Sequence, residues 1–194
     1  IDQTIDADVT VNYTVNVTST ATGGGVDYTL ANGTATISAG NTTTSIPVTI
    51  VNDDIDESNE TIVVVLSAPT NATLGNTVTS TYSILDNDTA GFTVSAISGN
   101  TTEAAGAATF SVVLTSEPTS LVTTTVATSD ATEGTVSTST LYFTAQNWDT
   151  PQTVTVTGVD DDVNDGNVAY TITLAAAQSQ DLNYHLLNPD DVSV

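Results

Sequence analysis

The chain has 194 residues, with 23 acidic side chains, one histidine and no lysine or arginine, so its formal net charge is −23. Because phosphate contacts require Lys or Arg, this composition excludes nucleic acid as a natural partner and argues against electrostatic binding to anionic lipid. No segment approaches the ~20 consecutive apolar residues that cross a bilayer, so we expect no membrane insertion, and without cysteine no disulfide can form.

Short apolar runs with period-two alternation predict β-strands along the whole chain. The clearest is residues 9–17, where every second residue from Val9 to Val17 is apolar. Similar runs follow at residues 46–51, 62–66, 78–85, 92–97, 110–114, 121–126, 141–143, 154–156 and 170–174. Gly, Asn, Asp and Pro fill the gaps, and no long segment has helical periodicity. The pattern predicts an all-β protein built as a sandwich.

An internal repeat divides the chain. NDDIDESNETIVVVLS (52–67) aligns with DDDVNDGNVAYTITLA (160–175) at a constant offset of 108 residues, and VDYTLANGTATI (26–37) aligns with TEGTVSTSTLYF (132–143) at an offset of 106. We therefore predict two tandem sandwiches, residues 1–89 and 90–194, joined just after ILDNDTAG.

The two predicted sandwiches are unequally complete. The second opens with two strand-like runs on either side of Glu103, for which the first has no counterpart, and the second ends before any closing D-N-D. A sandwich without its opening strands exposes unpaired edges and core. Either these residues are a window from a longer repetitive chain, or a neighbouring repeat or subunit completes the first sandwich by strand addition.

These residues resemble Calx-β domains. The resemblance rests on GVDYTLANGTATISAG, VTIVNDDIDESNETIVVVLS and ILDND in the first half, and on NWDTPQTVTVTGVDDDVNDGN in the second. It implies seven-stranded immunoglobulin-like sandwiches that bind Ca²⁺ at one end. The family includes cytosolic regulatory domains of sodium–calcium exchangers and tandem modules of bacterial surface proteins and adhesins. The Thr- and Asn-rich tandem without basic residues is closer to the bacterial type.

The chain departs from the family pattern at several ligand positions. Val168 stands where the first copy has Glu60, and Glu133 stands where it has Asp27. The first copy lacks a counterpart of Glu103, and the second lacks the closing D-N-D. Neither copy therefore contains a full ligand set within these residues.

Fifteen of the 23 acids fall in or beside these motifs. Ca²⁺ takes 6–8 oxygen ligands from carboxylates, carbonyls and water, and clustered carboxylates repel one another without a cation. In the implied sandwich, strand ends would bring the acid loops together as Ca²⁺ ligands. The candidates in the first copy are Asp27, Asp53, Asp54, Asp56, Glu57, Glu60, Asp86 and Asp88. Those in the second are Glu103, Asp130, Glu133, Asp160, Asp161, Asp162 and Asp165.

Other interpretations of the acids remain open. They could form solvated turns in which Asp and Asn side chains cap the backbone. Ions at Asp86 and Asp88 would stiffen the joint between the domains, whereas metal held only inside each domain would leave that joint flexible. A zinc site is not expected, because His185 is the only imidazole and no cysteine is present.

Catalysis is not expected, because the chain lacks Lys, Arg and Cys and its carboxylates are grouped as metal ligands are. We expect a calcium-stabilised structural module of an extracellular or cell-surface adhesin or filament. A Ca²⁺ sensor is one alternative. Calcium-dependent recognition of a surface glycan or protein receptor is another, suggested only by Trp148 and Tyr184, although Trp148 more often anchors a loop in such a setting.

Overall fold

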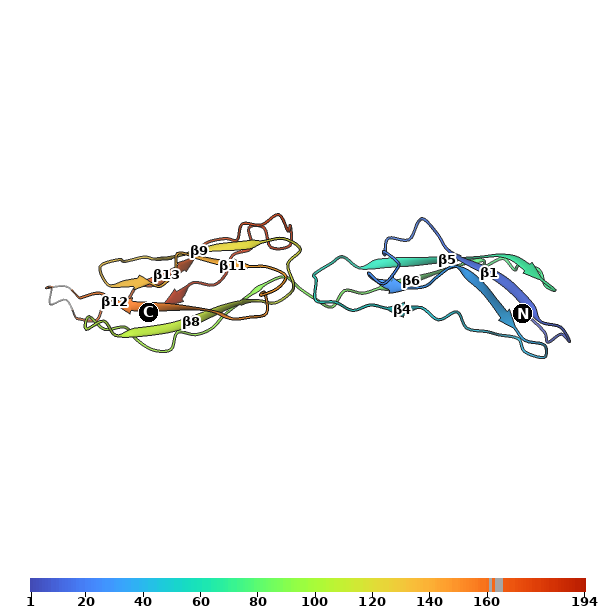
Figure 1. Ribbon diagram of the computed structural model, residues 1–194, viewed down its shortest axis with the longest axis horizontal. Coiled ribbons are helices and arrows are strands. Elements are labelled where there is room, and N and C mark those ends of the chain that lie inside the picture. The colour runs from blue at the N-terminus through green and yellow to red at the C-terminus, as the bar shows by residue number, and fades with distance from the viewer. Residues whose placement is uncertain (161, 163–165) are drawn as a thin grey trace. The chain divides into compact units, whose positions relative to one another are not determined.

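The computed structural model describes residues 1–160, 162 and 166–194, and these residues form an all-β structure (Figure 1). The predicted fold class is thereby confirmed, and the described residues include no helix that could span a membrane. The strands are β1 (Val9–Val15), β2 (Tyr28–Thr29), β3 (Gly33–Ile37), β4 (Thr49–Ile50), β5 (Glu60–Thr70), β6 (Thr79–Ile84), β7 (Phe92–Val94), β8 (Ala107–Leu114), β9 (Val122–Thr128), β10 (Gly134–Val136), β11 (Thr140–Phe143), β12 (Gln152–Gly158), β13 (Thr171–Leu174) and β14 (Val192–Ser193).

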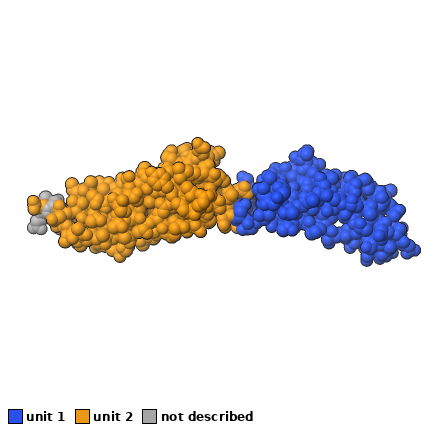
Figure 2. All heavy atoms as spheres, in the orientation of Figure 1, with its two compact units in different colours: residues 1–53, 58–86 blue, residues 54–57, 87–194 orange. Residues whose placement is uncertain are grey.

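The chain forms two compact units, coloured separately in Figure 2. Unit 1 comprises Ile1–Asp53 and Ser58–Asp86. Unit 2 comprises Asp54–Glu57 and Asn87–Val194, so the short acidic segment 54–57 belongs to unit 2 although its neighbours in sequence belong to unit 1.

Unit 2 is a sandwich of two four-stranded sheets, with strand orders β10-β12-β8-β7 and β11-β9-β13-β14. Alternating residues of both sheets point inward, and Phe143, Val154 and Ile172 are fully buried between them. Trp148 packs against this core, and Tyr184 is buried within it, where its hydroxyl lies 2.9 Å from Ser116 Oγ. Both aromatic residues therefore stabilise the sandwich, and Trp148 is the loop anchor that its type predicts.

Unit 1 has one four-stranded sheet, β3-β1-β5-β6, but its second sheet contains only β2 and β4. Its buried core cluster is correspondingly small and consists of Ala21, Tyr28, Ile62 and Val64.

The strand pairing shows how the units correspond. Val9 pairs with Ile37 in unit 1 as Val122 pairs with Phe143 in unit 2, and Tyr28 pairs with Ile50 as Gly134 pairs with Gly158. These pairs match β1 to β9, β2 to β10, β3 to β11 and β4 to β12. Strands β7 and β8 have no counterpart among the described strands of unit 1, which confirms the prediction that the first sandwich lacks its opening strands.

The predicted strands differ from the structure where partners are missing. The strand expected at 46–51 is reduced to β4, Thr49–Ile50, because unit 1 has no equivalent of β8 to pair with it. Strand β1 ends at Val15, and Val17 is 99% exposed. Strands β2, β3, β10 and β14 are too short or too rich in Gly and Thr to show a clear alternating pattern.

A close backbone contact explains Gly158 at the end of β12. A Cβ atom at this position would lie 2.2 Å from the carbonyl oxygen of Thr102, so only glycine fits. We expect Gly158→Ala to destabilise unit 2 by about 1–3 kcal/mol, because the Thr102 backbone must move. Hydrogen exchange of the β8 and β12 amides would measure the effect. Gly99→Ala is the control, since its Cβ would meet nothing within 4 Å; equal exchange in both variants would contradict the prediction.

Candidate metal sites

Two predicted ligands, Glu103 and Glu133, line one cleft of unit 2. The cleft has a volume of about 540 Å³ and is also bordered by Asn100, Asn167 and Tyr170. Glu133 immediately precedes β10, and its carbonyl oxygen accepts a hydrogen bond from the N–H of Val159 at 3.0 Å, directly after β12. The cleft therefore lies at the end of the sandwich where β10 begins and β12 ends.

A tight turn brings Glu103 to this end of unit 2. Thr102 and Gly106 form an isolated bridge around it, and Ala105 has a φ of 58°, in the left-handed region. The Gly106 carbonyl oxygen accepts a hydrogen bond from the Gly158 N–H at 3.1 Å, so the turn is fixed to the end of β12. The hydroxyl of buried Tyr170 lies 2.8 Å from Thr101 Oγ1 and holds the preceding residues in the same place.

Asp130 is engaged within its own turn. Its Oδ1 accepts hydrogen bonds from the Thr132 hydroxyl at 2.5 Å and from the Thr132 N–H at 3.0 Å. These two hydrogen bonds lower the pKa of Asp130 below its ordinary value of 3.8, because both stabilise the ionised form. The bond from the hydroxyl has the larger effect, and the bond from the backbone N–H the next largest. Asp130 therefore has a structural role in this turn, and it does not line the cleft of Glu103 and Glu133.

We expect Thr132→Val to raise the pKa of Asp130, because the hydrogen bond from the hydroxyl is lost. The pKa should still stay below 3.8, because the backbone N–H of residue 132 continues to donate. Since the pKa is lowered on folding, the carboxylate stabilises the fold above the unfolded value, and this contribution disappears as the pH falls through the lowered value. An NMR titration of the Asp130 carboxyl carbon measures the shift, with Thr135→Val as control. An unchanged pKa in Thr132→Val would rule out the hydroxyl as the cause.

The remaining predicted ligands of unit 2 follow β12. Asp160 and Asp162 are exposed, and neither lines the cleft of Glu103 and Glu133. Asp161 and Asp165 lie outside the described residues. The role of these four aspartates as ligands stays a prediction.

In unit 1, Asp27 occupies the position equivalent to Glu133. Its carbonyl oxygen accepts a hydrogen bond from the Val51 N–H at 2.9 Å, matching the bond from Val159 to Glu133 in unit 2. Asp27 is only 7% exposed, and its Oδ2 accepts a short hydrogen bond from the Thr22 N–H. The carboxylate thus closes the turn that leads into β2.

Strand pairing places three more predicted ligands at the same end of unit 1 as Asp27. Asp53 follows β4 just beyond Val51. Glu60 begins β5 and pairs with Ile84, two residues before Asp86. The N–H of Asp86 donates to Asn59 Oδ1 at 2.9 Å, which holds the end of β6 beside the start of β5.

The other predicted ligands of the first copy, Asp54, Asp56, Glu57 and Asp88, belong to unit 2. There Asp56 makes structural contacts: its Oδ2 accepts a hydrogen bond from the Ala90 N–H at 2.9 Å, and its carbonyl oxygen accepts one from Asn183 Nδ2 at 2.6 Å. The carbonyl oxygen of Asp54 accepts one from the Glu117 N–H at 2.6 Å. The ligand role of these four residues, and stiffening of a joint by Asp86 and Asp88, stay predictions.

Comparison with known proteins identifies the family. The family model described as "Calx-beta domain" matches residues 1–88 and again residues 86–194, which together cover the whole chain. The chain belongs to the Calx-beta family. Among solved structures, the tandem is similar to CBD12 from CALX1.2, at 18% identity and a TM-score of 0.46, over 99% of this chain and 89% of that one. It is also similar to the calcium binding domain CBD12 of CALX1.1, at 20% identity and a TM-score of 0.49, over 98% and 74%. No curated protein matches the chain.

The described part of this Calx-beta tandem holds no group of three or more Asp, Glu or His side chains arranged to bind a metal ion. In unit 2 the other polar side chains that line the cleft of Glu103 and Glu133 are amides and hydroxyls, which a pattern of acidic residues does not reveal. Asn100 and Thr101 could have been found, because they stand just before Glu103 in the sequence. Asn167 and Tyr170 follow the 160–165 acids, and only the folded structure shows that they border the cleft.

Proposed function

We propose that the cleft of Glu103 and Glu133 in unit 2 binds Ca²⁺ and that the tandem is a calcium-stabilised structural module. The observation that carries the proposal is that Glu103 and Glu133, which come from distant segments, line the same cleft at one end of the sandwich. Two carboxylates so placed attract a hard cation, since the chain offers no Lys or Arg to balance them.

The chemistry of the cleft fits calcium. Ca²⁺ accepts carboxylate, amide, hydroxyl and water oxygens together, and Glu103, Glu133, Asn100, Asn167 and Thr101 supply the protein oxygens of this kind. Two carboxylates suit a weak site of the extracellular class, with a Kd of about 10⁻⁴–10⁻³ M. Bound calcium would supply the positive charge that allows the Glu103 turn and the start of β10 to stay together.

In unit 1, Asp27 is the residue best placed for the same role, since it shares the backbone environment of Glu133. Its Oδ2 already accepts a hydrogen bond from Thr22, but a carboxylate has about four acceptor positions and can bind an ion as well. Asp53, Glu60 and Asp86 at the same end are further candidates.

The tandem arrangement supports a structural role in an extracellular adhesin or filament. A chain without Lys or Arg offers no cleavage site to trypsin-like proteases, and repeated sandwiches suit a long assembly. Recognition of a glycan through Trp148 and Tyr184 is not favoured, because Trp148 packs on the core and Tyr184 is buried.

Calcium binding by two charge-neutralised variants tests the proposal. We expect Glu133→Gln to weaken Ca²⁺ binding to unit 2 by about tenfold or more in calorimetric titration, since a ligand is lost. Asp149→Asn removes the same charge from an exposed position before β12, at the opposite end of the strand from Val159, and should change the affinity less than about twofold. Equal effects of the two variants would mean that only net charge attracts the ion.

A further inference from the structure

The turn that follows β1 contains an asparagine whose side chain is hydrogen-bonded to its own neighbour in sequence. Asn16 Oδ1 accepts hydrogen bonds from the backbone N–H and from the hydroxyl of Thr18, both at 3.0 Å. These bonds form an Asx turn. Residues 16–18 also read Asn-x-Thr, a sequon, which is the sequence in which an asparagine amide accepts a sugar.

This turn is anchored to β5 and exposes its middle residues to solvent. The Asn16 N–H donates to the Val63 carbonyl oxygen at 2.8 Å, and the Asn16 carbonyl oxygen accepts a hydrogen bond from the Ser19 N–H at 3.0 Å. Ser19 Oγ in turn accepts a hydrogen bond from the Val63 N–H at 2.9 Å. Between these anchors Val17 is 99% exposed, and Thr18 is exposed as well. The turn is therefore accessible to an enzyme while unit 1 stays folded.

Unit 2 contains an Asx turn of the same kind within its complete sandwich. Asp130 follows β9 as Asn16 follows β1, and its Oδ1 accepts hydrogen bonds from the N–H and the hydroxyl of Thr132. Ala131 and Thr132 are exposed there. The exposure of the middle of the turn is therefore a property of the turn itself, because it is present in the sandwich that has all its strands.

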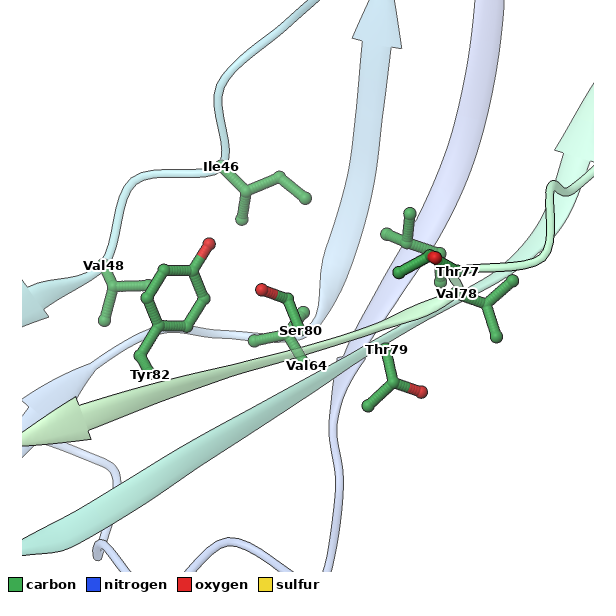
Figure 3. A pocket seen from close by; sticks show the side chains of 9 residues that line it. Ile46, Val48, Val64, Thr77, Val78, Thr79, Ser80 and Tyr82 are labelled. Carbon is green, nitrogen blue, oxygen red and sulfur yellow. The ribbon is translucent and has the colours of Figure 1, made fainter.

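The turn also lies apart from the open face of unit 1. An apolar pocket on that face is lined by residues that include Ile46, Val48 and Tyr82, as Figure 3 shows. None of residues 16–20 lines this pocket. The accessibility of Asn16 therefore does not depend on what covers the pocket.

The structure distinguishes this sequon from the others in the chain. Seven more sequons begin at Asn12, Asn32, Asn41, Asn59, Asn71, Asn87 and Asn100, and all eight lie in the described part of the chain. The side-chain oxygens of Asn12, Asn32 and Asn59 accept hydrogen bonds from other segments. Among these eight described sequons, only that of Asn16 has the threonine hydroxyl bonded to its own asparagine.

We propose that Asn16 of the folded chain is an acceptor for an N-linked sugar delivered by a nucleoside diphosphate sugar. The two hydrogen bonds to Oδ1 draw electron density from the amide, which makes the Nδ2 protons more acidic. Nδ2 attacks the anomeric carbon, the bond from that carbon to the diphosphate oxygen breaks, and the nucleoside diphosphate leaves with the electron pair. The Nδ2 proton passes to a base of the glycosyltransferase, and no oxidant or reductant is needed. This modification is independent of calcium binding.

Enzymatic transfer of glucose to the folded chain tests the proposal. A soluble N-glycosyltransferase specific for Asn-x-Thr is supplied with UDP-glucose, and cleavage before aspartate releases residues 8–26, which contain both Asn12 and Asn16, for mass spectrometry. We expect Asn16 to react about tenfold or more faster than Asn12 and Asn41, because its turn is preorganised. In a synthetic peptide of residues 8–26, Asn12 and Asn16 should react within about threefold of each other.

Two substitutions test whether the turn is responsible. Asp130→Asn converts the equivalent turn of unit 2 into a ninth sequon, and we expect it to react within about threefold of the rate of Asn16. Asn16→Asp should abolish modification of this turn, because a carboxylate keeps both hydrogen bonds but has no amide nitrogen. If Asp130→Asn fails to fold, the comparison of the unmodified chain with the peptide still decides.

Three results overturn the proposal. One is equal reaction of Asn16, Asn12 and Asn41 in the folded chain, which would mean that the turn confers no preference. Another is the absence of reaction at Asn16 with an enzyme that modifies the peptide. The third is a folded Asp130→Asn variant that stays unmodified at residue 130.

Discussion

We expect removal of calcium with EDTA to lower the melting temperature of the chain by roughly 10 °C, if the proposed calcium binding holds. Calcium that binds only the folded state adds RT ln(1 + [Ca²⁺]/Kd) to stability, about 2.7 kcal/mol at a hundredfold excess over Kd. About 10 mM calcium provides that excess for a Kd of about 10⁻⁴ M, and each kcal/mol shifts a domain of this size by about 4 °C. Differential scanning calorimetry with and without EDTA measures the shift.

Two controls connect this shift to the candidate site. Magnesium at the same concentration should restore less of the melting temperature, because it demands a rigid octahedral site. Glu133→Gln should lose most of the calcium-dependent shift of unit 2, and Asp149→Asn should retain it. A melting curve that EDTA leaves unchanged would refute calcium stabilisation.

Phe143→Ala should destabilise unit 2 by about 3–5 kcal/mol, the largest effect expected of a single substitution in this chain. Phe143 is fully buried and makes an edge-to-face contact with Phe92, with ring centroids 6.2 Å apart. Its truncation leaves a cavity between the two sheets that the neighbouring β-branched side chains cannot fill. Urea unfolding followed by NMR, which resolves residues of each unit, gives the free energy.

Ile37→Ala is the matched change in unit 1, since Ile37 stands at the repeat position of Phe143. Ile37 is partly exposed on β3, so we expect less than about 2 kcal/mol. Losses of equal size in the two units would show that unit 1 has a core as complete as that of unit 2.

The strands were predictable because apolar residues alternate along them. The unequal content of the two sandwiches was predictable because the two halves of the sequence can be aligned with each other. Val9–Val15 alternates clearly, and the offsets of 106 and 108 residues reappear as equivalent strand pairs. Strand length was less predictable. Residues 46–48 have the apolar pattern of Val154–Val156 but form no strand, because a strand also requires a neighbour to pair with.

The candidate ligands were harder to predict, since acids in turns have two uses that look alike in sequence. Asp27 and Asp130 accept hydrogen bonds from Thr22 and Thr132, as turn-closing aspartates do. Asp181 was not among the predicted ligands, and its Oδ2 accepts a hydrogen bond from the Thr119 N–H at 2.8 Å in the same way. Only the fold distinguishes Asp130 and Asp181 from Glu103 and Glu133, which line one cleft although their segments are far apart in the chain.

The difference between the two cores also sets an order of failure under tension. Unit 1 has four residues in its buried cluster and unit 2 has fifteen, so we expect a pull along the polypeptide to unfold the smaller core first. Unit 2 would then still be folded after the sheets of unit 1 have separated.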